Sequence, residues 1–222
     1  AGGTEPFTYQ WYKDGTALEG DQGTRLTIPL VAESAGNYTV VISNDYGSVS
    51  SQVANVQIYP VPQENTYEGI IYNLAPHAYW RLGESSGTLA FDRIGARNGL
   101  YTADNTLGKP GALKGDSDTS AWFGGVERVM APSMGIDSTA EVTMLAWIKS
   151  DGVIPHYAGV IFNRGGASTA SGMDIANEQV CYHWADGQYS FRSGLYPENN
   201  VWNLVALTIT PTAGTVYLGD SK

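Results

Sequence analysis

Apolar and polar residues alternate with a period of two along much of this chain. The clearest runs of this kind are residues 25–28, 38–42, 53–58 and 204–209. These runs are rich in β-branched and aromatic residues and are bounded by turn-forming residues, which is typical of half-buried β-strands. No stretch sustains the 3.6-residue period of an amphipathic helix. The pattern therefore predicts strands nearly throughout, with at most short helical turns.

Asp-Gly pairs mark candidate turns between predicted strands. Glycine tolerates the positive φ of a tight turn, so an Asp-Gly pair between two strands predicts a hairpin. Three such pairs occur, at Asp14-Gly15, Asp151-Gly152 and Asp186-Gly187. Hairpins join antiparallel strands, so antiparallel sheets are expected.

A proline-containing segment follows the run at 53–58. Pro60 and Pro62 cannot donate a backbone hydrogen bond, and both stiffen the chain. The chain has 222 residues, which exceeds the usual size of one domain. We therefore predict a first domain over residues 1–59, a linker over 60–66 and a second domain over 67–222.

Composition and charge narrow the class of protein. Hydrophobic residues make up 42% of the chain and aromatic residues 11%, which is enough for packed cores. A net charge of −10 disfavours nucleic acids and anionic membranes as partners. No apolar run approaches the length of a membrane helix, so membrane insertion is not expected. One cysteine, Cys181, excludes an intrachain disulfide. An acidic surface suits a soluble secreted protein, or one that binds Ca²⁺ or neutral sugars, and the alternative is that the charge serves solubility alone.

The first domain carries three landmarks in order. They are YQWYKDG at 9–15, TRLTI at 24–28 and ESAGNYTVVISNDYGSVSS at 33–51. Together they resemble the C strand, the E strand, and the E–F corner with the F and G strands of an immunoglobulin-like domain of the I-set or bacterial type. The resemblance implies that Trp11 and Tyr38 are buried in the core. It also implies a tyrosine corner, in which the Tyr38 hydroxyl bonds to upstream backbone.

Two positions depart from the immunoglobulin pattern. Val40 stands where the F-strand cysteine is usual, and Ser34 where the corner usually has an acidic residue. The segment before Trp11 is too short to hold the A strand and most of the B strand. We therefore expect a truncated immunoglobulin-like domain.

The second domain carries five segments that are individually degenerate but correctly ordered. They are residues 78–101, 108–133, 141–150, 159–166 and 199–220. Together they resemble the laminin-G-like family within the concanavalin-like jelly-roll fold. The resemblance implies that Phe123 and Trp147 are core residues, and the family pattern continues past residue 222. The expected fold class is all-β: an immunoglobulin-like sandwich followed by a jelly-roll sandwich whose C-terminal strands are missing.

Catalysis is not expected. Glucanases of the concanavalin-like fold use paired carboxylates on one strand face, and the comparable stretch here, Asp174 to Glu178, lacks the middle acid. The three histidines, His77, His156 and His183, are not spaced like a zinc site. The sequence therefore predicts a protein that is not an enzyme.

Calcium is the one cofactor that the sequence supports. Hard oxygen ligands in loops suit Ca²⁺, and members of the resembled family often hold it at a loop rim. The candidate ligands are Asp92, Asp116 and Asp118. The alternative role of Asp116 and Asp118, which flank Ser117, is to form the turn through side-chain hydrogen bonds.

Aromatic residues in the predicted hairpin at 181–189 are candidates for ligand contact. Alternation places Tyr182 and Trp184 on one face of the hairpin and Cys181 and His183 on the other, and Tyr189 lies near its end. Aromatic rings that stack on sugar rings are common in lectin-like modules. The alternative is that these rings are buried, since one face of the hairpin must be core.

These observations predict an extracellular binding or adhesion module of a larger bacterial surface or secreted protein. Its expected partner is a glycan or a protein on a surface, or other copies of the chain. The alternative is a structural repeat of a stalk, filament or surface layer with no ligand of its own. An exposed aromatic cluster would favour sugar binding, and extensive contacts between chains would favour assembly.

Overall fold

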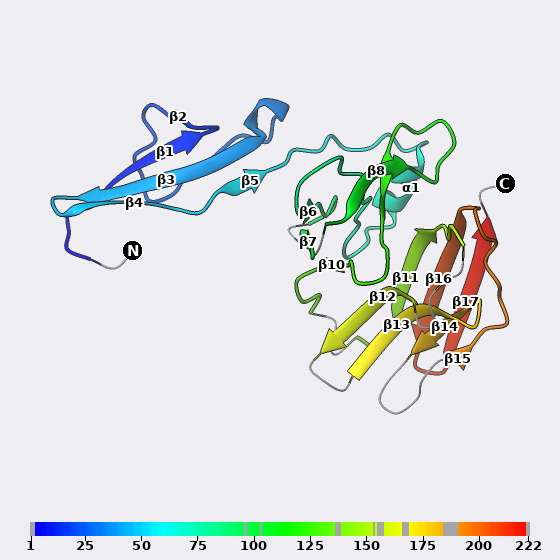
Figure 1. Cartoon of the computed structure of the whole chain (residues 1–222). Coiled ribbons are helices and arrows are strands. Elements are labelled where there is room, and N and C mark those ends of the chain that lie inside the picture. The colour runs from blue at the N-terminus through cyan, green and yellow to red at the C-terminus, as the bar shows by residue number, and fades with distance from the viewer. Residues whose placement is uncertain are drawn as a thin grey trace. The chain divides into compact units, whose positions relative to one another are not determined.

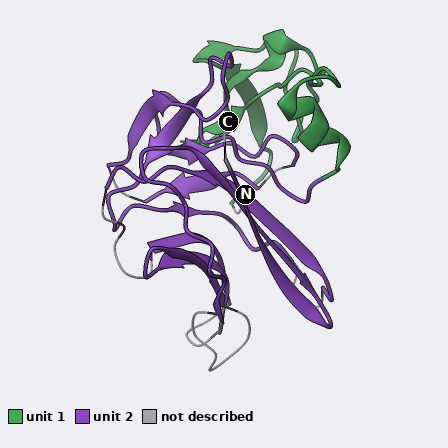
Figure 2. Ribbon diagram, turned by 90° about the vertical axis from the view of Figure 1, so that its right-hand side faces the viewer, with its two compact units in different colours: residues 1–75 green, residues 76–222 purple. Residues whose placement is uncertain are grey.

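The computed structural model describes residues 3–220 except 96, 103, 136–138, 153, 155–157, 166–168 and 184–190. The protein is mostly β, with 43% strand, antiparallel sheets and one short α-helix, which confirms the predicted class at this level. The chain divides into two compact units, residues 1–75 and 76–222 (Figure 2). This division falls after the segment 60–66, whose role as a linker stays a prediction.

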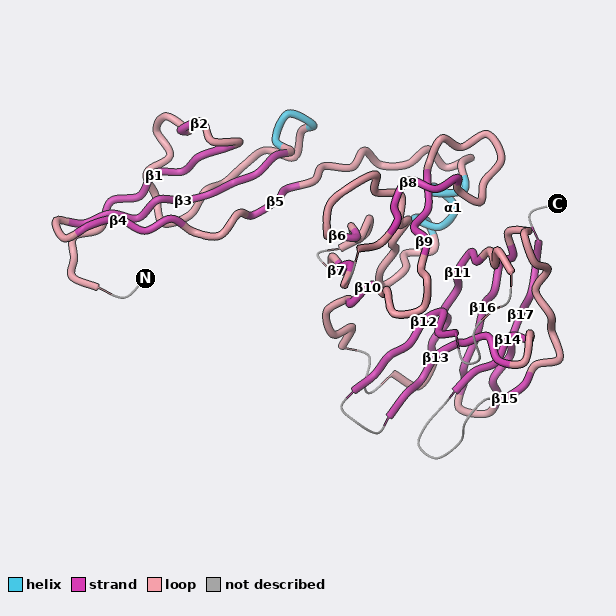
Figure 3. The backbone as a smooth tube through the Cα atoms, in the orientation of Figure 1, coloured by secondary structure: helices cyan, strands magenta, loops and turns pink. Residues whose placement is uncertain are grey.

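Unit 1 contains one antiparallel sheet (Figure 3). Its strands are β1 (Thr8–Lys13), β2 (Thr16–Ala17), β3 (Gly36–Asn44), β4 (Gly47–Ser50) and β5 (Ala54–Val56). Their order is β2-β1-β3-β4, with β5 also paired to β3. The predicted turn at Asp14-Gly15 joins β1 and β2, with φ values of 49° and 82°. The carboxylate of Asp14 also accepts the backbone N–H of Asn37 at 2.9 Å.

The predicted hydrogen bond of Tyr38 is confirmed. Its hydroxyl donates to the backbone carbonyl of Ser34 at 2.8 Å, and both residues are buried. Ser34 ends a short 3-10 turn, η1 (Ala32–Ser34), that leads into β3. Trp11, predicted to be buried, lies opposite Val40 and is only half-buried, and its indole N–H donates to the Gly23 carbonyl at 2.9 Å.

The strand predicted at 24–28 is not a strand in the structure. Leu26 and Ile28 are half-buried and their neighbours are exposed, as alternation predicts. A strand is defined by a hydrogen-bonded ladder, and no described residues pair with this segment. The alternation at 24–28 therefore predicts which side chains are buried, but it does not predict whether the segment pairs with another strand.

The one α-helix was not predicted. Helix α1 (Tyr67–Asn73) begins after Thr66, whose hydroxyl accepts the Gly69 N–H at 3.0 Å. A Cβ at Gly69 would lie 2.0 Å from the Gln63 carbonyl oxygen, so glycine allows the proline-containing segment to approach the helix. This contact places α1 in unit 1 although the sequence favoured assigning residue 67 onward to the second domain.

Unit 2 is built on two antiparallel sheets that pack face to face (Figure 1). One sheet has the order β11-β16-β17, and the other has the order β12-β13-β14-β15. Their bounds are β11 (Val142–Ile148), β16 (Asn203–Thr210), β17 (Ala213–Asp220), β12 (Ala158–Gly165), β13 (Thr169–Ala176), β14 (Gln179–His183) and β15 (Phe191–Arg192). The core between the sheets consists of six buried side chains, Met173, Ile175, Val180, Val205, Leu207 and Ile209.

Two smaller sheets precede this core in the sequence. One has the order β10-β7-β6, from β10 (Val129–Met130), β7 (Gly99–Tyr101) and β6 (Leu89–Ala90). The other pairs β8 (Thr106–Pro110) with β9 (Thr119–Trp122). They carry the loop carboxylates described below.

Phe123 and Trp147, which were predicted to be core residues of unit 2, are not part of the core between the two sheets. Phe123 is 39% exposed because it follows the last residue of β9, where the chain leaves its only strand partner. Trp147 is half-buried, and its strand neighbours Ala146 and Ile148 are the residues that pack on the core. Because alternate residues of a strand face opposite sides, Trp147 lies on the outer face of its sheet.

The hairpin between β13 and β14 has no glycine in its turn. Asn177 and Glu178 have φ values of 50° and 63°, as the two central residues of a type I′ turn require. Asparagine tolerates this conformation better than most residues, but glutamate does not. The Asn177-Glu178 pair was therefore not recognised as a turn signal in the sequence.

Candidate functional site

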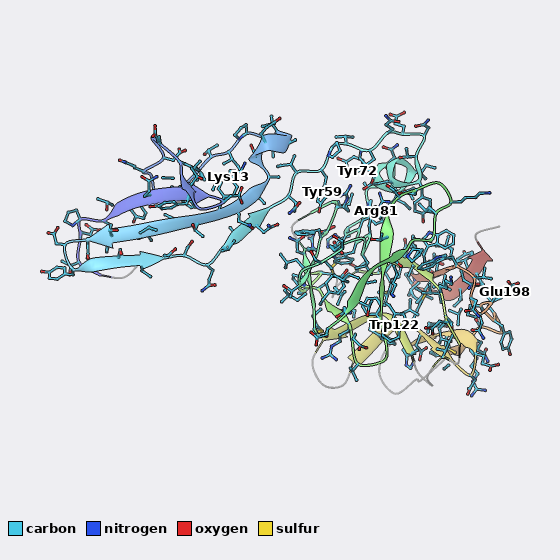
Figure 4. All side chains as sticks on the ribbon, turned by 45° about the horizontal axis from the view of Figure 1, so that its top comes forward. Lys13, Tyr59, Tyr72, Arg81, Trp122 and Glu198 are labelled. Carbon is cyan, nitrogen blue, oxygen red and sulfur yellow. The ribbon has the colours of Figure 1, made fainter. Side chains whose placement is uncertain are left out.

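Asp116 and Asp118, two of the predicted calcium ligands, are paired with Arg81, which is labelled in Figure 4. The guanidinium Nη2 lies 2.9 Å from a carboxylate oxygen of Asp116, and Nε donates to Asp118. The Asp118 N–H also donates to Asp116 Oδ1 at 2.9 Å, which is the turn-forming bond that the sequence left open as an alternative.

These contacts favour the ionised form of Asp116. The hydrogen bond from the Asp118 N–H, together with the nearby Arg81 guanidinium, lowers the pKa of Asp116 from its ordinary value of 3.8. A carboxylate whose pKa is lowered in the folded state stabilises the fold above its ordinary pKa, and this stabilisation is lost as the pH falls through the lowered value.

Asp92, the third predicted ligand, is buried two residues after β6, where it forms an isolated β-bridge with Trp80. Its two carboxylate oxygens accept backbone N–H groups of Tyr79, Ile94 and Arg97 at 2.9, 3.1 and 3.3 Å. These bonds satisfy the carboxylate without a metal ion. Asp92 therefore connects the backbone at Tyr79, before β6, to that at Ile94 and Arg97, after it.

Glu84 accepts two hydrogen bonds in the same part of unit 2. It accepts the Phe91 N–H at 2.9 Å and the Tyr101 hydroxyl at 2.7 Å. Burial, with the Glu84 carboxylate as a further cause, raises the pKa of Tyr101, so this phenol stays protonated. The network therefore holds β6 and β7 together.

The described residues contain no group of three or more His, Cys, Asp and Glu side chains placed to hold a metal ion. In this geometry Ca²⁺ would have to displace Arg81 from Asp116 and Asp118. Calcium at these positions stays a prediction.

Of the three predicted aromatic contacts, only Tyr182 falls within the described residues. Trp184 and Tyr189 lie outside them. Tyr182 packs against the core between the sheets and stacks on Phe191, with ring centroids 4.8 Å apart and an interplanar angle of 16°. A Cβ at Gly214 would lie 2.9 Å from the Tyr182 hydroxyl, so glycine makes room for that ring on β17. Phe191 remains 39% exposed at the edge of the sheet.

The opposite face of the same sheet carries a buried polar cluster. Asp174 on β13 lies opposite Cys181 on β14, and its Oδ2 is 3.1 Å from Nε2 of His183. All three residues are buried, and Oδ1 of Asp174 has no hydrogen-bond partner among the described residues. Burial and the neighbouring Asp174 charge raise the pKa of the Cys181 thiol, which makes it a poor nucleophile.

The sequence did not identify three of these contacts. Phe191 and Arg81 were not singled out, and the pairing of Asp174 with His183 depends on a ladder that joins residues nine positions apart. The signal would have been an acidic residue before a tight turn and a histidine two residues beyond the position that pairs with it, as Asp174 pairs with Cys181. The turn at Asn177 and Glu178 contains no glycine, so the hairpin that brings Asp174 and His183 together was not predicted.

A scan against protein-family models found no match, and a search of curated proteins found no similar sequence. Within the described part of the chain, no helix has both the length and the apolar character needed to cross a membrane.

Proposed function

We propose that this chain is a non-catalytic binding module of an extracellular or bacterial cell-surface protein. Its partner would be a glycan or a protein on a surface. In finer detail, unit 1 would be an immunoglobulin-like domain and unit 2 a laminin-G-like jelly roll.

The observation that carries this proposal is the exposure of aromatic side chains in unit 2. Five of them are more than a third exposed, namely Trp122, Phe123, Phe191, Tyr196 and Tyr217. A large aromatic ring that is left in water forgoes the favourable free energy of its burial. Such rings are also enriched where proteins bind their partners. Their exposure favours a binding surface over a purely structural one.

Features of both units support the finer fold. The order β1-β3-β4 and the bond from Tyr38 to Ser34 agree with the C, F and G strands and the tyrosine corner of an immunoglobulin-like domain. The two stacked antiparallel sheets of unit 2 agree with a jelly roll.

The position of the two candidate acids supports a role without catalysis. Asp174 is buried against His183, and Glu178 lies in an exposed turn. A glycosidase needs two carboxyl groups that face one substrate. These two groups do not share a surface, so the exposed aromatic rings are better explained by binding than by turnover.

A second candidate function, assembly into a stalk or surface layer, is favoured by a separate observation. Unit 1 exposes the apolar side chains of Leu30, Val49 and Val53. Exposed apolar side chains favour contact between copies of a chain. The two functions make different predictions for the same measurements.

The test combines a glycan array with sedimentation of the full 222-residue chain. We expect binding to some glycans, with weak affinity per module, and a monomer in solution. A reducing-sugar assay on the bound glycans should show no release. No binding to any glycan together with self-association would replace the binding proposal by the assembly one. Sugar release abolished by Asp174→Asn would refute the non-catalytic role.

A further inference from the structure

The outer face of the sheet β11-β16-β17 carries apolar and aromatic side chains in two rows and threonine side chains in a third. The inner face of this sheet packs on the core through alternate residues, such as Met144, Leu207 and Val216. The residues between them therefore point to the outer face. The ladder aligns these outer residues in rows that cross the three strands.

Two of these rows are apolar and contain one aromatic ring each. One row is Leu145, Ala206 and Tyr217, and the next is Trp147, Leu204 and Gly219. Tyr217 is 53% exposed and Trp147 is half-buried. Tyr217 lies directly opposite the small side chain of Ala206, whereas Leu204 separates Trp147 from Gly219.

The third row consists of three threonines, Thr143, Thr208 and Thr215. Threonine hydroxyls can both donate and accept hydrogen bonds. Of the nine outer positions in the three rows, none carries a charge, although the chain as a whole has a net charge of −10. This face can therefore bind a neutral, hydroxyl-rich ligand without desolvating a charged group.

The two rings are far enough apart for an extended ligand. Trp147 and Tyr217 are on the outer strands of the sheet and one row apart. Two strand spacings of about 4.8 Å and two residues of about 3.4 Å each place their Cα atoms about 12 Å apart. A chain of a few linked pyranose rings spans that distance, with one sugar on each aromatic ring.

The small size of this face argues against a protein as its partner. A stable protein interface takes about 20–30 residues from each side. The three rows provide nine positions, and the neighbouring inward residues are committed to the core. A linear glycan needs no larger area than these rows offer.

We propose that the outer face of β11-β16-β17 binds a neutral polysaccharide chain, which stacks on Trp147 and Tyr217 and hydrogen-bonds to the threonine row. This inference rests on the proposed function and specifies its ligand class and binding surface. The hairpin at 181–189 has no part in it.

The experiment measures affinity of the full chain for soluble neutral polysaccharides, namely a mixed-linkage β-glucan, a β-1,3-glucan, a xylan and a galactomannan. Affinity gel electrophoresis suits weak binding of this kind. Tyr217→Ala and Trp147→Ala should weaken binding to the recognised polysaccharide by about tenfold or more. Tyr217→Phe and Trp147→Phe keep a ring and should bind within a few-fold of the parent chain.

Tyr46→Ala is the matched control, because Tyr46 is 84% exposed but belongs to unit 1 and not to this face. It should leave affinity unchanged. Binding should also be nearly independent of salt, because the face has no charge, and polygalacturonate, an anionic polysaccharide, should bind more weakly. Circular dichroism and the melting temperature show whether each variant is folded, and Tyr217→Ala alone decides the question if Trp147→Ala unfolds.

The outcomes separate the two proposals. If the parent chain binds a polysaccharide and folded Tyr217→Ala binds it equally well, the outer face is not the site and the binding function stands. Loss of binding in Tyr46→Ala but not in Tyr217→Ala would move the site elsewhere. If the parent chain binds no glycan in this set or on the array, the proposed glycan function and this inference both fail.

Discussion

The two units contain strands with the same alternation but bury them to different extents. In unit 2 the inward residues of two stacked sheets, such as Val205 and Leu207, are fully buried. In unit 1 the described strands form a single sheet, and the row that joins Tyr9 and Ile42 ends at Val49, which is 62% exposed. Alternation thus specifies which side of a strand is apolar, and the second layer determines how much of that side is shielded from water.

The largest effect should come from a matched pair of valines. Val205→Ala in unit 2 should destabilise its own unit by about 1.5–3 kcal/mol, since it removes two buried methyl groups and leaves a cavity. Val49→Ala in unit 1 should change stability by less than about 0.5 kcal/mol. Calorimetry of the two melting transitions measures both values. Equal losses would mean that the face of unit 1 is covered in solution.

Unit 1 should depend more on a single hydrogen bond. Tyr38→Phe removes the donor to the Ser34 carbonyl and leaves a buried acceptor without a partner, which should cost about 1–2 kcal/mol. Tyr46→Phe is the control, because Tyr46 is almost fully exposed. Urea denaturation monitored by fluorescence gives both values. A Tyr38→Phe chain as stable as the parent would show that the corner contributes nothing.

The smallest effect should be the acid sensitivity of unit 2. Asp116 has a lowered pKa, so its contribution is present above pH 3.8 and is lost as the pH falls below that value. Asp116→Asn should therefore destabilise unit 2 slightly at pH 7, and the difference should shrink as the pH falls below 3.8 through the lowered pKa. Melting curves across this range test the sign. A variant that lost more stability in acid than at neutral pH would contradict the assigned role of Arg81.

Much of the secondary structure could be predicted from local pattern. Alternation predicted β3 and β16, and Asp14-Gly15 predicted the first hairpin, since the physical cause of each lies within a few residues. The Tyr38 bond was also predictable, because its acceptor is only four residues away.

The errors arose where burial depends on distant parts of the chain. On β11 both sets of alternate residues are apolar, so the sequence does not show that Trp147 belongs to the outer set. Phe123 looked like a mid-strand residue because the end of β9 is set by its pairing with β8. The candidate surface shares this difficulty, since its rows combine residues from three strands that are up to 76 positions apart in the sequence, from Thr143 to Gly219.

The cross-strand rows also have an evolutionary consequence. Each position of β16 serves either the core or the outer face, so the outer residues can be replaced one at a time without disturbing Val205 or Leu207. A single-residue insertion or deletion within the strand would exchange the two sets and would put the core residues in water. The lineage of this sheet should therefore show many substitutions on its outer face and changes of length only in its turns.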